Sequence, residues 1–509
     1  MLKSACSACC VVLALALCSC GSYKRGFSPT APTPSTPPAS LSSIKHIIVL
    51  VQENRSLDSY FGAMRQYWAQ NQIPDESFDG LPQFNPTSGQ APLQGIAPTN
   101  PGCNPANPSP SDCLFDTAPS AAVTSYHLQT MCVENPSPSW NEAHADWDYN
   151  DQVGNSPPTL NGFVWSAAHD ARVLKYYDQD GLRAMGYYDG SDLNYYYYMA
   201  SYFATSDRWF QPVLSRTQIN RAYLFAATSQ GRVYPNNTDS NDSTPMTAKT
   251  IFQDLQDAGI TWKIYENPVN TGCSGPPYDP ACLMKASELY EFAYAQTIVS
   301  NYPQNIVPIS QYFTDLQNGT LPQVAYIDPA TDAGFDEHPT VNDAIPSNIQ
   351  YGANYVSSLI NALMSSSSWQ NSVFILTWDE SGGFYDHVSP QPAVSPDGIK
   401  PSDLEPGDTC TQAVGPTCDF TYTGYRVPLI VISPFVKKHY VSHTVADYTA
   451  ILKFIEKRFN VPALTKRDAA QMDMTEFFDF QNPPWMTPPS NPPPPVQNTK
   501  GACYVDHLP

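Results

Sequence analysis

A short β-branched run that ends in two oxygen-bearing side chains is the feature that most constrains the fold of this chain. Residues 47–51 read Ile-Ile-Val-Leu-Val, and Glu53 and Asn54 follow almost at once. Such a run is typical of a strand buried on both faces of a parallel sheet. Ligands of open α/β sheets bind beyond the carboxyl ends of strands, where a carboxylate and an amide can ligate a hard cation. A solvated strand end and a turn residue are the alternative interpretation.

Two other segments show the same pattern of an apolar run followed by acids. Residues 324–328 end in Asp328, and residues 373–378 run directly into Asp379 and Glu380. Because parallel strands deliver their carboxyl ends to one edge of a sheet, these acids are expected to meet. Oxygen ligands favour a hard or borderline divalent cation, whose identity the sequence leaves open. The candidate metal ligands are Glu53, Asn54, Asp379 and Glu380.

Strands and helices are expected to alternate along the chain. Apolar spacing predicts helices at 284–301 and 349–364, and a fourth buried strand at 426–435. Alternation of this kind predicts an α/β fold, a three-layer αβα arrangement around a largely parallel central sheet. Long loop insertions are expected as well, above all residues 75–125, which are rich in Pro, Asn, Ser and Gly.

A hydroxyl group lies near the expected start of another helix. Thr217 precedes the apolar stretch that ends near Ala227. A helix N-terminus favours anions because its free amides and its dipole are both positive. Thr217 could therefore be a nucleophile facing a phosphoryl group, or simply the N-cap of the helix. His338, in a polar loop, could donate to the phosphoryl oxygens or protonate the leaving group.

The first residues predict export. A basic start is followed by an apolar run, Val11 to Leu17, that is too short to span a bilayer. The sequence around Cys20 is similar to a bacterial lipobox, so residues 1–20 are expected to be a lipoprotein-type signal peptide and Cys20 a lipid-anchored residue. An ordinary cleaved signal is the alternative. Residues 21–43, rich in Pro and Ser, are expected to form a linker. The protein is therefore expected in the cell envelope or outside the cell.

The cysteines agree with export. Of thirteen, five lie at or before Cys20, which leaves an even eight. An even number outside the cytosol favours disulfide bonds, and no CxxC motif in the mature part indicates a zinc site. The expected pairs are Cys103–Cys113, Cys273–Cys282, Cys410–Cys418 and Cys132–Cys503.

The charge balance excludes one class of partner. The chain has 26 basic and 47 acidic residues, a net charge of -21. Nucleic-acid backbones require a basic surface, so no nucleic-acid partner is expected. A single phosphate group is still compatible, because a bound metal can neutralise it locally.

Several motifs resemble a bacterial and plant phosphoesterase family that includes phosphatidylcholine-type phospholipases C and an acid phosphatase, with an alkaline-phosphatase-like fold. The matching segments are residues 53–58 (ENRSLD), 60–62 (YFG), 215–221 (SRTQINR), 337–339 (EHP), 379–388 (DESGGFYDHV), 426–428 (RVP) and 433–434 (SP). The resemblance implies Thr217 as nucleophile, His338 near the phosphate, and the four metal ligands named above. It also implies part of a catalytic role for His144. By their place in these motifs, the candidate substrate-binding residues are Asn220, Arg221 and His387.

Two departures from the family pattern put the substrate in doubt. Arg216 and Ile219 stand where the family has two prolines. Residues 137–140 read Ser-Pro-Ser-Trp where the family has Asp-His-Ser-Trp, so one site histidine is missing.

The expected function is hydrolysis of a phosphoric ester by an exported, metal-dependent enzyme. A phospho-threonine intermediate is expected, with either a phospholipid or a small phosphoester as substrate, so that the enzyme is of the phospholipase C or the acid phosphatase type. The catalytic domain is expected at 44–485 and a Pro-rich tail at 486–509. A catalytically weak surface lipoprotein that binds a phosphorylated ligand is the alternative.

Overall fold

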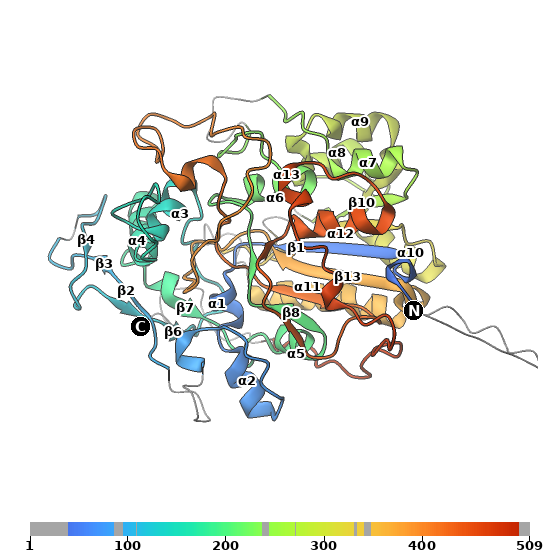
Figure 1. Cartoon of the computed structure of the whole chain (residues 1–509), viewed down its shortest axis with the longest axis horizontal. Helices are drawn as coiled ribbons and strands as arrows, with labels where there is room; N and C mark the ends of the chain where they lie inside the picture. The colour runs from blue at the N-terminus through green and yellow to red at the C-terminus, as the bar shows by residue number, and fades with distance from the viewer. Residues whose placement is uncertain are drawn as a thin grey trace, which may run out of the picture. The chain divides into compact units, whose positions relative to one another are not determined.

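A mostly parallel sheet lies at the centre of the fold (Figure 1). The computed structural model describes residues 39–497 apart from 86–94, 108, 237–243, 270, 330–332 and 340–347. Within these residues eight strands form the sheet, in the order β11-β10-β12-β1-β13-β14-β8-β15. Their bounds are β11 Ile306–Pro308, β10 Trp262–Glu266, β12 Val324–Asp328, β1 His46–Gln52, β13 Ser372–Trp378, β14 Leu429–Ile432, β8 Ala204–Ser206 and β15 Tyr440–Ser442.

Strand β1 is the central strand of the parallel half. It pairs in parallel with β12 on one side and β13 on the other, and Leu50 lies opposite Ile327 and Leu376. All three side chains are at most 2% exposed. The register explains how the acids converge, because Gln52 lies opposite Trp378 and the next residues are Glu53 and Asp379.

Helices cover both faces of this sheet. Figure 1 shows α6, α7 and α12 on one side and α5 and α11 on the other. The expected three-layer α/β fold with a largely parallel sheet is therefore confirmed. The helices are α1 Leu57–Phe61, α2 Met64–Asn71, α3 Trp140–Trp147, α4 Phe163–Leu174, α5 Asn194–Tyr202, α6 Thr217–Ala226, α7 Ile251–Asp257, α8 Pro280–Ala286, α9 Tyr294–Asn301, α10 Ser310–Asn318, α11 Ile349–Ser365, α12 Ala450–Phe459 and α13 Lys466–Ala469.

Short strands outside the central sheet belong mainly to the insertions. Three small two-stranded pairs are built from the region between residues 99 and 187. The bounds are β2 Thr99–Asn100, β3 Gly102–Cys103, β4 Phe115–Asp116, β5 Val123–Thr124, β6 Tyr126–His127, β7 Gly186–Tyr187, β9 Trp209–Phe210 and β16 Ala446–Asp447.

Two expected elements differ from the structure. The strand expected at 426–435 is shorter and runs antiparallel to β13. Prolines at 428 and 434 lack an amide donor and flank it on both sides. The helix expected at 284–301 is broken after α8, because Ser287 has an extended backbone and its hydroxyl donates to Asp328 (2.5 Å).

Three of the four predicted disulfides are confirmed. Cys103–Cys113, Cys273–Cys282 and Cys410–Cys418 are bonded. Cys132 is also disulfide-bonded, but its predicted partner Cys503 lies outside the described residues.

The predicted terminal segments are described only in part. The signal peptide at 1–20 and nearly all of the linker at 21–43 lie outside the described residues. The described part of the predicted tail contacts the catalytic unit, since Asn194 donates to the Pro494 carbonyl (2.9 Å). Among the described helices, none has both the length and the hydropathy that a membrane span requires.

Leu50→Ala is expected to lower the free energy of unfolding by about 2–5 kcal/mol, because it leaves a cavity at the centre of the sheet. Leu114→Ala is the matched control, since Leu114 is 60% exposed. Urea unfolding of both variants measures the difference. Equal losses in the two variants would contradict the central position of β1.

Candidate active site

A cavity of about 360 Å³ lies where the predicted nucleophile and two predicted metal ligands meet. It receives residues from the end of β1, the start of α6, the end of α4 and three loops. The lining residues are Glu53, Asn54, Asn135, Ser137, Pro138, Ser139, Asp170, Leu174, Tyr176, Arg216, Thr217, Gln218, Glu288 and His338.

Asn54 has a left-handed backbone (φ 57°) that is held from both sides. Asparagine tolerates this conformation better than most residues. Its amide donates to Asp379 Oδ1 (3.0 Å), and Arg55 Nη1 donates to its carbonyl (2.8 Å). The Asn54 side chain is thereby directed at α6, where its Oδ1 accepts a hydrogen bond from Thr217 Oγ1 (3.3 Å).

Thr217 is the first residue of α6, and Arg216 occupies the N-cap position. The alternative in which the Thr217 hydroxyl caps the helix therefore does not apply. Its side chain lies at the positive end of a ten-residue helix and lines the cavity. This placement suits a hydroxyl that meets an anionic phosphoryl group.

Arg221, one helical turn further, is buried among carboxylates. Its guanidinium lies 3.1 Å from Glu53 Oε1, 3.3 Å from Asp379 Oδ2 and 3.7 Å from Asp328 Oδ1. It is not among the residues that line the cavity. The guanidinium therefore neutralises the acids at the strand ends, and its position does not support the substrate contact expected from the sequence.

The four predicted metal ligands follow the neighbouring strands β1 and β13, where hydrogen bonds link the backbones of Asn54 and Glu380 to Asp379. Asp379 Oδ1 accepts the amides of both Asn54 and Glu380. Glu380 Oε2 accepts from Gly382 (2.5 Å), whereas its buried Oε1 has no hydrogen-bond partner. Burial and the Asp379 carboxylate raise the pKa of both Glu53 and Glu380. An all-oxygen donor set with one unsatisfied carboxylate oxygen fits a hard divalent cation, which Glu53, Asn54, Asp379 and Glu380 would hold.

Two glycines let the loops approach one another here. Gly382 and Gly383 have φ values of +71° and +76°. A Cβ atom on Gly382 would lie 2.5 Å from the Asn54 carbonyl oxygen, and one on Gly383 would lie 2.6 Å from the Ser137 carbonyl oxygen. The loop after β13 can therefore contact both neighbouring loops only with glycine at these positions.

His338 is partly exposed and lines the cavity. Its Nδ1 donates to the Pro339 carbonyl (2.5 Å), so Nε2 is the nitrogen left for chemistry. The preceding residue, Glu337, is fully buried with φ +69°. Its carboxylate accepts hydrogen bonds from Tyr60 (2.9 Å), Tyr196 (2.5 Å) and Trp378 (3.2 Å). This anchor fixes the loop that carries His338, and burial raises the pKa of Glu337 to about 7.

Asp379 and Glu380 are not among the cavity-lining residues, and neither are three other predicted site residues, His144, Asn220 and His387. His144 is buried against Trp140, its Nδ1 is 2.7 Å from the Trp140 carbonyl, and burial lowers its pKa to about 4. Asn220 accepts the Val213 amide (3.1 Å) and so shapes the turn before α6. His387 lies between the carboxylates of Asp58 and Asp79. The positions of His144, Asn220 and His387 indicate that they support the site from outside the cavity.

The cavity also contains acids that the sequence did not single out. Asp170 comes from α4, and Glu288 from the turn after α8. Burial is the largest influence on both and raises the pKa of each to about 7. Neither follows a strand or belongs to a motif, so no sequence signal marks them.

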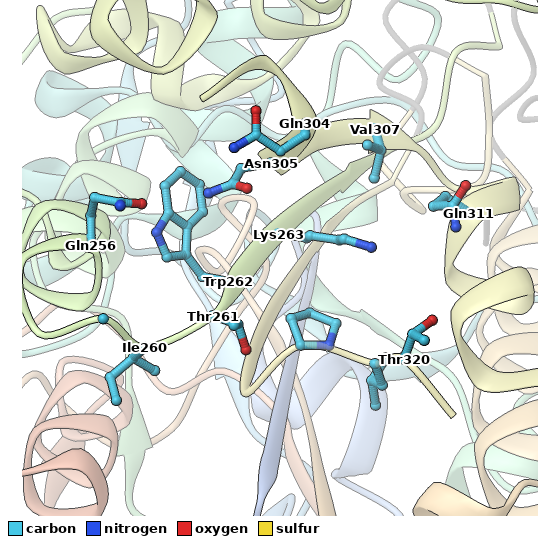
Figure 2. A pocket seen from close by; sticks show the side chains of 13 residues that line it. Gln256, Ile260, Thr261, Trp262, Lys263, Gln304, Asn305, Val307, Gln311 and Thr320 are labelled. Atoms are coloured by element: carbon cyan, nitrogen blue, oxygen red, sulfur yellow. The ribbon is translucent and has the colours of Figure 1, made fainter. Parts of the chain in front are cut away.

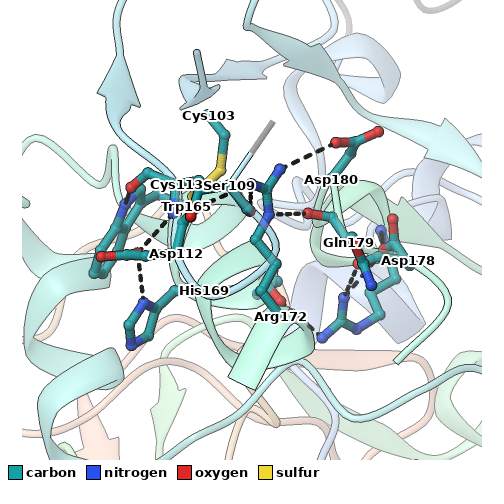
Figure 3. The surroundings of a disulfide bond; sticks show 12 residues. Cys103, Ser109, Asp112, Cys113, Trp165, His169, Arg172, Asp178, Gln179 and Asp180 are labelled. Atoms are coloured by element: carbon teal, nitrogen blue, oxygen red, sulfur yellow. Dashed lines mark hydrogen bonds and ion pairs between the residues drawn. A yellow bond between two sulfur atoms is a disulfide. The ribbon is translucent and has the colours of Figure 1, made fainter. Parts of the chain in front are cut away.

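The disulfide-closed loop at 103–113 supports the helix that carries Asp170. Arg172 on α4 donates to the carbonyls of Ser109 (2.7 Å) and Asp112 (3.1 Å) (Figure 3). It also donates to the Gln179 carbonyl (2.9 Å). The loop and the segment after α4 are thereby held at one side of the cavity.

A second, larger cavity of about 700 Å³ lies at the opposite edge of the sheet (Figure 2). It is lined by residues that precede β10, β11 and β12, such as Thr261, Asn305 and Pro322. Lys263 extends into it and forms an ion pair with Asp315 (2.5 Å). Its lining combines amide and hydroxyl side chains with apolar ones and Lys263, whereas the smaller cavity brings a hydroxyl, a histidine and carboxylates together.

The fold and this site together define a class, an α/β enzyme with a helix-terminal hydroxyl beside an acidic strand edge. The sequence profile of the Phosphoesterase family matches residues 44–462, and the chain belongs to this family. It is accordingly a hydrolase that acts on phosphoester bonds.

Known relatives agree with this assignment. Phospholipase C B of Mycobacterium tuberculosis is 30% identical over 88% of this chain and 80% of its own length. Non-specific phospholipase C3 of Arabidopsis thaliana is 27% identical over 84% and 72%. A solved phosphonate monoester hydrolase of Silicibacter pomeroyi overlaps 53% of this chain and 69% of its own, with 12% identity and a TM-score of 0.26. That structural likeness is too slight to carry an argument.

The His387 site predicts a pH dependence of stability. Its Nδ1 lies 2.6 Å from Asp58 Oδ2 and its Nε2 lies 3.3 Å from Asp79 Oδ1. Burial alone would lower the pKa of His387, but the two carboxylates outweigh burial and Arg426 and raise it to about 9. Because the folded pKa exceeds the ordinary value of 6.5, this stabilisation is complete below about pH 6.5. It is lost as the pH rises through about 9.

Urea unfolding at a series of pH values tests this expectation. The wild-type protein should lose up to about 3 kcal/mol between about pH 6.5 and 10 from this group. His387→Gln should be less stable at neutral pH and should show a flatter profile over that range. Parallel profiles for the two proteins would contradict the assignment.

Proposed function

We propose that the protein is an exported, metal-dependent phosphoric ester hydrolase that works through a phospho-threonine intermediate. The observation that carries the proposal is the hydrogen bond from Thr217 Oγ1 to Asn54 Oδ1, at a helix N-terminus and inside a cavity. The same Asn54 is bonded through its amide to Asp379 of the acidic strand edge. Asn54 therefore connects the proposed nucleophile to the proposed ligands of the cation.

The chain's own groups account for the steps of the reaction. Thr217 Oγ1 loses its proton to solvent and attacks phosphorus, and the bond from phosphorus to the leaving oxygen breaks. His338 Nε2, in its protonated form, donates a proton to that leaving oxygen. Water then attacks the phosphothreonine, phosphate or a phosphoalcohol leaves, and Thr217 regains its proton. When bound, a divalent cation lowers the pKa of the hydroxyl and neutralises phosphoryl oxygens.

The substrate class is proposed from the relatives and from the cavity. Curated relatives are named phospholipases C, which supports a phospholipid substrate, with a small phosphomonoester as the other choice. Leu174 and Tyr176 give the cavity an apolar side next to its acids. The disulfides Cys103–Cys113, Cys273–Cys282 and Cys410–Cys418 support export, since such bonds persist in oxidising compartments. A lipid on Cys20 would attach the protein to the cell envelope.

Thr217→Ala is expected to lower kcat on the order of 10³-fold or more, because the attacking oxygen is removed. Hydrolysis of p-nitrophenyl phosphate and of p-nitrophenyl phosphorylcholine measures the loss and also separates monoesterase from diesterase activity. Thr217→Ser keeps a hydroxyl at the same position and should keep part of the activity. Equal rates in wild type and Thr217→Ala would refute the nucleophile. Turnover of neither substrate by the wild type would favour a ligand-binding protein.

Removal of metal should abolish hydrolysis, and one divalent cation should restore it. Glu380→Gln keeps the size of the side chain but loses its charge, so it should bind less metal per protein. Elemental analysis of the purified protein measures bound metal independently of activity. Glu456→Gln is the matched control, because Glu456 is a buried glutamate on α12 that is not one of the expected ligands. Full activity after exhaustive chelation would exclude metal dependence.

A further inference from the structure

The two departures from the family motifs lie beside each other in the structure. Arg216 Nη2 donates to Ser139 Oγ at 2.8 Å. Both residues line the cavity together with Ser137 and Pro138. One departure places an arginine directly before the nucleophile, and the other removes a histidine from the facing loop. An arginine that the family motif lacks is therefore bonded to the loop in which the family motif has a histidine.

The described lining of the cavity contains more acids than strongly basic side chains. The acids are Glu53, Asp170 and Glu288, whereas Arg216 is the one arginine or lysine among these lining residues. A phosphoryl group brings at least one negative charge into this acidic environment. Burial raises the pKa of the Asp170 and Glu380 carboxyls, and the positive charge of Arg216 opposes that rise in both. The guanidinium therefore lies close enough to act on the acids of the site.

Arg216 directly precedes Thr217 and lines the same cavity. Arg216 is the N-cap residue of α6, with an extended backbone (φ -83°, ψ -179°), and the Thr217 oxygen belongs to the next residue. It is partly exposed to the cavity. A guanidinium has several donors in a planar fork that matches two oxygens of a phosphoryl group. The bond to Ser139 Oγ orients the group within the cavity lining.

We infer that Arg216 binds the phosphoryl oxygens of the substrate, with Ser139 as its positioning residue. The inference rests on the proposed function, since it concerns the same cavity and the same nucleophile. Arg216 supplies, from the nucleophile segment, the positive charge that residues 137–140 do not supply. It contacts the non-bridging oxygens while Thr217 attacks phosphorus, so it should stabilise the bound substrate, the transition state and the product phosphate.

The test compares Arg216→Gln and Arg216→Lys with the wild type on p-nitrophenyl phosphate, with inorganic phosphate as competitive inhibitor. Arg216→Gln should lower kcat/KM by about 10- to 100-fold and weaken phosphate inhibition by a similar factor. Arg216→Lys should recover part of both losses because it keeps the charge. Arg65→Gln is the matched control, because it removes only the ion pair between Arg65 on α2 and Asp75, and it should leave both values unchanged.

Two results would overturn the inference while leaving the proposed function intact. Arg216→Gln could keep kcat/KM and phosphate inhibition within about twofold of wild type while Thr217→Ala is inactive. Alternatively, Arg216→Gln could lower kcat/KM while phosphate inhibition stays at the wild-type level, which would show that Arg216 does not contact the phosphoryl oxygens. If Thr217→Ala hydrolyses p-nitrophenyl phosphate at the wild-type rate, the proposed function itself fails. Ser139→Ala should weaken phosphate inhibition in the wild type but not in Arg216→Gln.

Discussion

The buried guanidinium of Arg221 holds the site together. Three parallel strands bring Glu53, Asp328 and Asp379 to one edge of the sheet, and Arg221 from α6 contacts all three. Buried carboxylates repel one another and are tolerated only when they are paired. The same ion pairs connect the sheet to α6, the helix that begins with Thr217. The position of the Thr217 hydroxyl therefore depends on a charge balance one helical turn away from it.

Two buried residues, Asn54 and Glu337, fix the loops around the sheet and α6. Asn54 is held by Asp379 and Arg55, and it bonds in turn to Thr217. Glu337 is held by three donors from α1, α5 and β13 and thereby places His338. Both anchors have left-handed backbones, a conformation that persists only where the surroundings impose it. These two anchors therefore hold Asn54 beside Thr217 and fix the loop that carries His338.

The fold and part of the site could be predicted from the sequence, and the reasons are physical. The strands β1, β12 and β13 are continuous apolar runs, so their burial and the acids that follow them can be read directly. Strand direction depends on the whole topology, and the antiparallel β14 was therefore not foreseen. Arg221 belongs to a sequence motif, and on that basis we expect it to contact the substrate. The motif does not show that three carboxylates surround its guanidinium in the fold. Asp170 and Glu288 reach the cavity only through tertiary packing, which leaves no local signal.

Thr217 is proposed to carry the phosphoryl group during the reaction. Mass spectrometry can test this on enzyme that is quenched in acid during turnover of p-nitrophenyl phosphate and then digested. One phosphoryl group should appear on the peptide that contains Thr217 and on no peptide of the Thr217→Ala variant. An active enzyme that shows no phosphorylated peptide, or phosphorylation at another residue, would contradict it.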